Sequence, residues 1–163
     1  MTITLRRADF SDSRLAHFLQ SHLDDLRPTA PAESRHALNV DALRQPSVRL
    51  WAAWDGESMA ATGALAVLEP GHEELKSMRT APGLRGRGVG RLMLQHLLED
   101  AAARSVQRIS LETGSMDFFA PARRLYESAG FVACAPFGSY REDPHSVFMR
   151  LDLPGQVRPA PLT

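Results

Sequence analysis

The 163-residue chain lacks the features that mark an exported, membrane-spanning or metal-binding protein. Cys134 is its single cysteine, so it can form no internal disulfide and it carries no cysteine-rich metal motif. No apolar run approaches the ~20 residues that a transmembrane helix needs, and the N-terminal segment lacks the apolar stretch of a signal peptide. We therefore expect a cytoplasmic protein, in a reducing compartment, that has no membrane partner.

An excess of charge of either sign is also missing. Lys and Arg together number 19, as do Asp and Glu, so the chain lacks the basic surplus that dominates nonspecific nucleic-acid binding. The six histidines are scattered without the paired spacing of a metal site. The sequence thus predicts no nucleic-acid partner and no bound metal.

The composition that remains is that of an ordinary folded domain, with 44% hydrophobic and 23% charged residues. The length fits one domain, which we place at residues 1–153, and residues 154–163 hold three prolines and little to bury, so we expect a mobile tail. Apolar periodicity, caps and turns predict the order β, α, α, β, β, β, α, β, α, β, β. The corresponding segments are strand 3–5, helices 15–26 and 34–43, strands 48–54, 58–68 and 75–80, helix 89–101, strand 109–112, helix 121–129, and strands 131–135 and 147–153.

A turn rich in glycine and arginine separates the strand at 75–80 from the helix at 89–101. Glycines let backbone N–H groups converge on an anion, and the next helix adds unpaired donors and the positive end of its dipole. Two other phosphate loops are disfavoured: the Lys-Ser or Lys-Thr of an ATP loop and the third glycine of an NAD loop are missing. A plain mobile linker is the alternative. The turn reads Gly83-Leu84-Arg85-Gly86-Arg87-Gly88-Val89-Gly90, with Arg91 following.

This turn resembles motif A of the GNAT superfamily of acyl-CoA-dependent acetyltransferases, written R/Q-x-x-G-x-G/A. Arg85, Gly88 and Gly90 match that motif. The resemblance extends over residues 2–153, with the part before Glu73 the least diagnostic. Two further stretches carry it in the family's order, the second being similar to A-x-x-LYE-x-x-GF: Glu74-Leu75-Lys76-Ser77-Met78-Arg79-Thr80 and Ala122-Arg123-Arg124-Leu125-Tyr126-Glu127-Ser128-Ala129-Gly130-Phe131.

The resemblance implies an α/β fold with a mixed, mostly antiparallel sheet of about six to seven strands, flanked by about four helices. The sheet should splay between the strands at Leu75 and Ile109, where acetyl-CoA enters as cosubstrate. The backbone of the first of these strands would pair with the pantetheine arm of CoA, and the glycine-rich turn would hold its pyrophosphate. The residues implied to contact the cofactor are Met78, Arg79, Thr80, Arg85, Gly86, Arg87, Gly88, Val89, Gly90, Arg91 and Tyr126.

Two side chains receive catalytic roles from the same resemblance. Tyr126 would donate a proton to the departing thiolate as general acid, because a phenol with a pKa of ~10 is protonated at neutral pH. The alternative is an aromatic side chain that only packs on an amphipathic helix. Glu74 matches the position where several members keep a carboxylate base for the acceptor amine. A solvated Glu at a strand end, with an ordered water as the base, is the alternative.

One position departs from the family pattern. Many members have Asn three residues before the Ala of the last motif, in contact with the cofactor, and this chain has Phe119 there. With Phe118 it would form an apolar wall beside pantetheine or the acceptor. Ser115 or Thr113 would then replace the lost polar contact.

The implied function is transfer of an acetyl group to a primary amine of a small molecule, by direct attack on the thioester and without a metal. A noncatalytic acyl-CoA-binding sensor or regulatory module is the alternative. We place the acceptor among the first helices, Glu74, Glu112 and the loop at 140–145, whose carboxylates and aromatic side chains suit a cationic or zwitterionic small molecule. Monomer and homodimer both stay open. Basic residues that would equally suit an acidic group are Arg35, Arg44 and Lys76.

Overall fold

The structure is a computed structural model that describes residues 1–26 and 40–154. The order of its elements agrees with the predicted one, apart from two short 3-10 turns, η2 and η3. The predicted start of the second helix at Ser34, the cation Arg35 and the tail residues 155–163 lie outside the described residues. The elements are β1 (Ile3–Arg7), α1 (Ser13–Leu26), α2 (Val40–Leu43), β2 (Val48–Asp55), β3 (Ser58–Glu69), β4 (His72–Thr80), η2 (Pro82–Leu84), α3 (Val89–Ala103), β5 (Arg108–Gly114), η3 (Asp117–Phe119), α4 (Ala120–Ser128), β6 (Val132–Ala133) and β7 (Ser146–Asp152).

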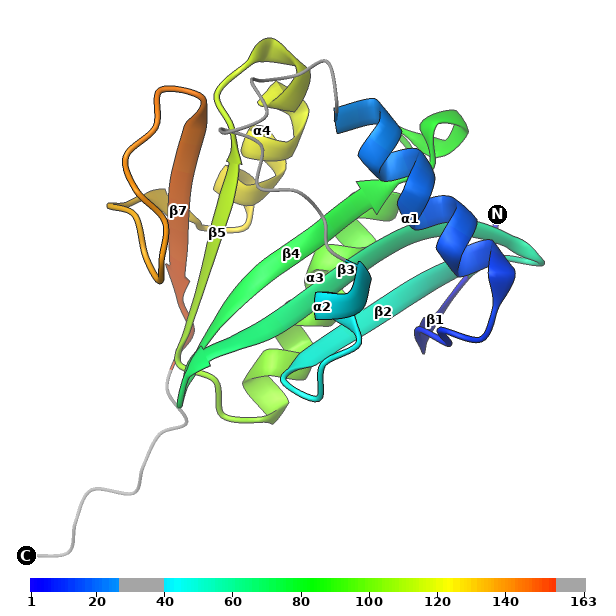
Figure 1. Ribbon diagram of the computed structural model, residues 1–163, viewed down its shortest axis with the longest axis horizontal. Coiled ribbons are helices and arrows are strands. Elements are labelled where there is room, and N and C mark those ends of the chain that lie inside the picture. The colour runs from blue at the N-terminus through cyan, green and yellow to red at the C-terminus, as the bar shows by residue number, and fades with distance from the viewer. Residues whose placement is uncertain (27–39, 155–163) are drawn as a thin grey trace, which may run out of the picture.

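The strands form a seven-stranded sheet in the order β1-β2-β3-β4-β5-β7-β6 (Figure 1). All neighbours are antiparallel except β4 and β5, which run parallel. The parallel pairing is short, because its register begins with His72 opposite Arg108 and ends with Glu74 opposite Ser110. Beyond that point the two strands diverge (Figure 1). The predicted splay of a mostly antiparallel sheet is therefore confirmed.

Helices cover both faces of the sheet, with α1 and α2 on one face and α3 and α4 on the other (Figure 1). In α1 the buried residues recur at the spacing of one helical face, which explains how the helix attaches to the sheet. None of the described helices is long and apolar enough to cross a membrane. The main core lies under α3 and α4 and includes Leu65, Leu75, Met93, Leu97, Ile109, Leu111, Tyr126 and Phe131, and a second cluster under α1 and α2 consists of Leu15, Leu19, Leu43, Leu50 and Ala64.

The start of β4 is polar but buried, and the strand begins at His72 rather than at the predicted Leu75. Arg104, just after α3, donates to both carboxylate oxygens of buried Glu73, at 2.7 and 2.9 Å. Asp100 extends this network, since it also lies 3.2 Å from Arg104. Alternating apolar residues are the signal from which a strand is predicted. The start of β4 lacks that signal, because its buried position carries a charge that is paired.

The predicted strand 131–135 is reduced to Val132–Ala133 at the edge of the sheet. It follows Gly130, whose φ of 103° ends α4 in the left-handed conformation that the sequence predicts for a helix stop. The chain between β6 and β7 then crosses back over the sheet. Its residue Tyr140 reaches β4, where its hydroxyl donates to Glu74 at 2.6 Å. This loop therefore borders the splay.

Candidate active site

β4 carries a bulge close to the point where it leaves β5. Gly63 on β3 stands opposite two residues of β4, Ser77 and Met78. Ser77 has a φ of 56°, in the left-handed region, and its carbonyl accepts a hydrogen bond of 2.9 Å from the Thr62 hydroxyl. A Cβ on Gly63 would lie 2.9 Å from the Met78 sulfur and 2.8 Å from Leu97, so any other residue here would force these side chains to move. Because a bulge leaves one residue out of the ladder, backbone groups near Met78 are available to a ligand.

The glycine-rich turn forms the N-terminus of α3. Gly88 is the N-cap with a φ of 83°, and Gly86 has a φ of 77°, so both adopt left-handed conformations that glycine tolerates without strain. No side chain caps this end of the helix, which leaves its first N–H groups open to an anion. No atom lies within 4 Å of the position that a Cβ would take on either glycine. The turn therefore has both the donors and the room that a phosphate needs.

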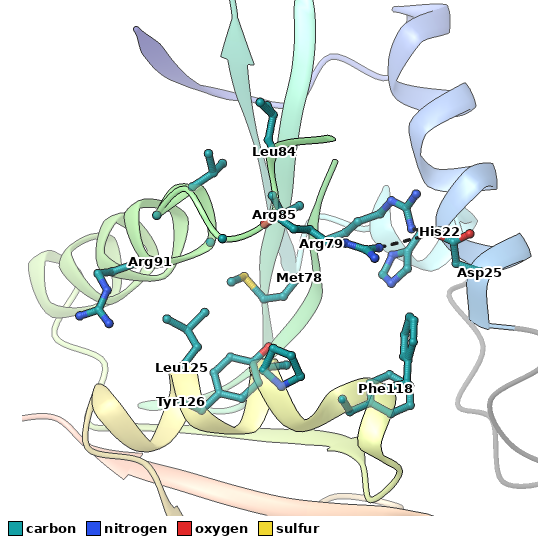
Figure 2. Close-up of a pocket in the computed structure, with 18 of the residues that line it drawn as sticks. His22, Asp25, Met78, Arg79, Leu84, Arg85, Arg91, Phe118, Leu125 and Tyr126 are labelled. Carbon is teal, nitrogen blue, oxygen red and sulfur yellow. Dashed lines mark hydrogen bonds and ion pairs between the residues drawn. The ribbon is translucent and has the colours of Figure 1, made fainter. Parts of the chain in front are cut away.

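A pocket of about 890 Å³ lies between the end of α1, the end of β4, this turn and the start of α4 (Figure 2). Every residue that the resemblance assigned to the cofactor lines this pocket except Arg87, whose side chain is exposed elsewhere on the turn. A tight turn projects successive side chains in different directions, so Arg85 and Arg91 reach the pocket and Arg87 does not. The contact between Arg87 and the cofactor thus stays a prediction, and the geometry does not favour it.

Tyr126 is buried, with only 6% of its surface exposed, and its ring packs edge to face against Phe131. Figure 2 shows its hydroxyl directed from α4 toward Met78 on β4. Burial, and after it the negative charge of Glu112, raises the pKa of Tyr126 above its usual range. The phenol therefore carries its proton at neutral pH, and Tyr126 lines the pocket.

The aromatic pair at the start of α4 lines the pocket as predicted, with the rings of Phe118 and Phe119 5.0 Å apart, edge to face. Phe119 packs against Gly114 so closely that a Cβ there would overlap its ring. Neither Ser115 nor Thr113 lines the pocket, so their replacement of the polar contact stays a prediction that this lining does not favour. The Ser115 hydroxyl instead donates to the backbone carbonyl of Pro144, at 2.7 Å.

Asp25 ties two predicted cofactor contacts to α1, and sequence reasoning missed it. Arg79 donates to the Asp25 carboxylate at 2.6 Å, and Arg85 lies 3.8 Å from the same oxygen. His22, one turn earlier in α1, also lines the pocket. Burial, followed by the positive charge of Arg79, lowers the pKa of His22 to about 4. His22 is thus neutral at physiological pH. One N–H group of Arg79 is therefore bonded to Asp25 on α1 and not to a ligand.

Two carboxylates stand at the splay, outside the lining of the pocket. Glu74 is buried; Tyr140 donates to its Oε2 at 2.6 Å, and the Lys76 ammonium lies 4.0 Å from its Oε1. Glu112, on β5, is half-buried. Burial raises its pKa to about 7, with the Ser146 hydroxyl acting in the opposite direction and the charge of Glu74 adding to the rise. Within residues 1–26 and 40–154, no group of three or more His, Cys, Asp or Glu side chains could hold a metal ion.

The sequence model of the Acetyltransferase (GNAT) family matches residues 14–131. The chain belongs to the GNAT family of acetyltransferases. It is 46% identical over 141 residues to the uncharacterized N-acetyltransferase YsnE of Bacillus subtilis, across 86% of this chain and 93% of YsnE. It is 43% identical over 150 residues to the uncharacterized N-acetyltransferase YedL of Escherichia coli, across 92% of this chain and 94% of YedL.

A solved GNAT-family acetyltransferase from Staphylococcus aureus has the same fold, with a TM-score of 0.73 at 20% identity, over 94% of this chain and all (100%) of that one. These matches confirm the family predicted from the three motifs. They also identify the chain as an acyl-CoA-dependent acetyltransferase, which favours an enzyme over a noncatalytic acyl-CoA-binding module. The roles of individual side chains remain predictions.

Proposed function

We propose that this acetyltransferase transfers the acetyl group of acetyl-CoA to a primary amine of a small molecule by direct attack. One observation carries the proposal: a single pocket joins the uncapped N-terminus of α3 to the Tyr126 hydroxyl at the splay of β4 and β5. This arrangement suits a long ligand with phosphates at one end and a thioester at the other. The relatives YsnE and YedL are both named N-acetyltransferases, which supports nitrogen as the acceptor atom.

The unpaired edge of β4 suits the middle of the cofactor. Because β5 pairs with β4 only as far as Glu74, the backbone from Leu75 to Thr80 has no strand partner on that side. An extended ligand that carries amide groups can add to such an edge as a further strand. We assign the pantetheine amides to the backbone of Met78 and Thr80. The pyrophosphate then reaches the backbone N–H groups at Gly86 to Gly90, with Arg85 and Arg91 beside it.

The chemistry follows from the groups around the splay. The amine nitrogen attacks the thioester carbonyl, and backbone N–H from the bulge at Met78 stabilises the developing oxyanion. When the carbon–sulfur bond breaks, Tyr126 gives its proton to the sulfur as general acid. A carboxylate takes a proton from the acceptor nitrogen. Glu74 is the candidate that the family resemblance supplies, and Glu112 faces the same gap from β5.

The acceptor side is lined by aromatic and acidic groups, which favours a cationic small molecule. Phe137, Tyr140 and Phe148 form an aromatic cluster with ring centroids 5.1 to 6.0 Å apart, in which Phe137 packs edge to face against the other two rings. The cluster packs the loop before β7 onto the sheet next to buried Glu74. Cations are attracted to both aromatic faces and carboxylates. We therefore place a small cationic amine, rather than a folded protein surface, beside this cluster.

An assay of thiol release with acetyl-CoA and a panel of amines, amino acids and peptides tests the proposal. We expect turnover with at least one small cationic amine. Replacing Tyr126 with phenylalanine should lower kcat by about 10² to 10⁴-fold, the usual value of general acid catalysis, and weaken the binding of acetyl-CoA much less. Release of thiol only with peptide or protein acceptors would overturn the small-molecule acceptor. Binding of acetyl-CoA without turnover for any acceptor would support the noncatalytic module instead.

A further inference from the structure

We propose that the side chain of Arg79, together with His22, binds a carboxylate of the acceptor, so that the small molecule that receives the acetyl group is an amino acid. The inference rests on the proposed function, because it names the class of amine that the same acetyl-transfer reaction uses. In this assignment only the backbone of Arg79 lies along the pantetheine arm. Its side chain belongs to the acceptor.

The bulge in β4 sets the direction of the Arg79 side chain. In a regular strand side chains alternate, so Arg79 would project from the same face as Leu75, which packs in the core under α3. The bulge adds one residue and shifts this alternation, and Met78 packs against that core instead. Arg79 reaches Asp25 on α1, on the opposite face. It therefore projects from the same face as Glu74, beside which we place the acceptor.

The guanidinium of Arg79 is buried but only partly paired. The residue is 9% exposed, its guanidinium carbon lies 5.3 Å from the centre of the Phe18 ring, and Nη1 donates to Asp25 at 2.6 Å. Among residues 1–26 and 40–154, neither its buried Nε nor the buried Nδ1 of His22 has a hydrogen-bond partner. Buried polar atoms are nearly always paired, so two unpaired nitrogens on neighbouring side chains point to a polar ligand.

Both residues line the pocket, and Figure 2 shows the Arg79 side chain extending from β4 toward His22 and Asp25 on α1. The two unpaired nitrogens are themselves shielded from the pocket. An anion at this wall therefore contacts the Nη groups of Arg79 first, and it pairs with Nε only when the side chain turns.

The charge of this wall favours an anion with one negative charge. Arg79 and Arg85 are both cations, and Asp25 is the one carboxylate that contacts them, at 2.6 and 3.8 Å. The hydrogen bond from Arg79 is the main cause that lowers the pKa of Asp25, so this carboxylate is ionised. His22 is neutral and adds polar atoms without charge. One positive charge is left over, and a guanidinium binds a planar carboxylate with two parallel hydrogen bonds.

The position of this cation relative to the reaction centre fits an amino acid. Arg79 directly follows Met78, the residue at the bulge to which we assign the thioester carbonyl, and their Cα atoms are ~3.8 Å apart. A carboxylate on Arg79 thus holds the amine of the same small molecule close to the thioester. The ammonium end then points along the same face toward the buried carboxylate of Glu74.

The test measures kcat/KM at saturating acetyl-CoA for amino acids and for the matching carboxamides, which lack the carboxylate. The two kinds of acceptor differ in amine basicity, so the decisive quantity is the change in their ratio between wild type and variant. Arg79→Gln should lower the preference for the acid by about 10- to 100-fold, the value of a hydrogen bond between charged groups. Arg79→Lys should keep part of the preference, because it keeps the charge and loses the planar fork. His22→Leu should lower it by about 2- to 10-fold.

Arg85→Gln is the matched control, because Arg85 faces the same Asp25 carboxylate from the glycine-rich turn. It should raise the Kd of CoA and leave the ratio of acid to carboxamide unchanged. Binding supplies a readout without turnover. In calorimetry on the CoA complex, Arg79→Gln should raise the Kd of an N-acetyl amino acid and not that of its carboxamide. The melting temperature with CoA verifies that each variant is folded.

The outcomes separate this inference from the proposed function. Turnover of amines with an unchanged ratio in Arg79→Gln would overturn the carboxylate site and leave the acetyl transfer intact. An equal fall for acid and carboxamide would show that Arg79 only fixes α1, and a larger rise in the Kd of CoA than in Arg85→Gln would make its side chain a cofactor ligand. Either result overturns the inference. Absence of wild-type turnover with every amine would overturn the proposed function and, with it, this assignment.

Discussion

Replacing Gly88 with alanine probes the anion-binding end of α3 at a single methyl group. Gly88 caps α3 with a φ of 83°, and no atom lies within 4 Å of the position that a Cβ would take. The alanine therefore clashes with nothing, and its effect on stability comes only from the left-handed backbone, about 1–2 kcal/mol. In a domain of this size that loss lowers Tm by about 2–8 °C.

The effect on cofactor binding should exceed the effect on folding. The methyl group would enter the open space through which we expect a phosphate to approach the first N–H groups of α3. The loss of one hydrogen bond to a charged group is worth about 1.5–3 kcal/mol, or roughly a tenfold to hundredfold rise in the Kd of CoA. Titration calorimetry with CoA measures this rise. Pantetheine, which has no pyrophosphate, should bind the variant and the wild type equally.

Gly83 supplies the matched control in the same turn. Its φ lies outside the left-handed region, and a Cβ on it also meets nothing within 4 Å. Gly83→Ala should therefore leave both Tm and the Kd of CoA close to the wild-type values. If folded Gly88→Ala binds CoA as tightly as Gly83→Ala does, the pyrophosphate does not bind at this turn, and the reasoning is refuted.

Three other predictions concern stability. Arg104→Met leaves the Glu73 carboxylate buried without its partner, and it should lower the free energy of unfolding in urea by about 3–5 kcal/mol. Adding Glu73→Gln should restore part of this loss. A loss below ~1 kcal/mol would contradict the pairing. Because the unfolded state protonates His22 near pH 6.5 and the folded state only near pH 4, folding should lose up to about 3 kcal/mol as pH falls through that window. His22→Gln should flatten this pH dependence, and an unchanged slope would show that His22 is not its source. Gly63→Ala places a Cβ 2.9 Å from the Met78 sulfur and should cost about 1–3 kcal/mol and lower kcat/KM, whereas wild-type stability would mean that the bulge adapts freely.

Local patterns predicted most of the architecture of this acetyltransferase. The apolar spacing of α1 and α3, the glycine that ends α4 and the alternation in the strands are local signals, because each depends on residues within about one turn or one strand. The anion-binding character of the glycine-rich turn was predicted equally well, because it depends on the backbone of consecutive residues. The ends of the strands were predicted less accurately where a charged residue is buried. β4 begins at His72, and its buried Glu73 is paired with Arg104, which is distant in sequence.

The sequence by itself determined the family, the order of the elements and the stretch of chain that forms the N-terminus of α3. Only the tertiary structure decided which side chains share a site. It brought Asp25 from α1 to Arg79 on β4, and it took Tyr140 across two strands to Glu74. Those contacts join residues that are 54 and 66 positions apart in the sequence. The physical reason is that a carboxylate's proton affinity depends on burial and on charges supplied by other elements, and no spacing along one segment records them.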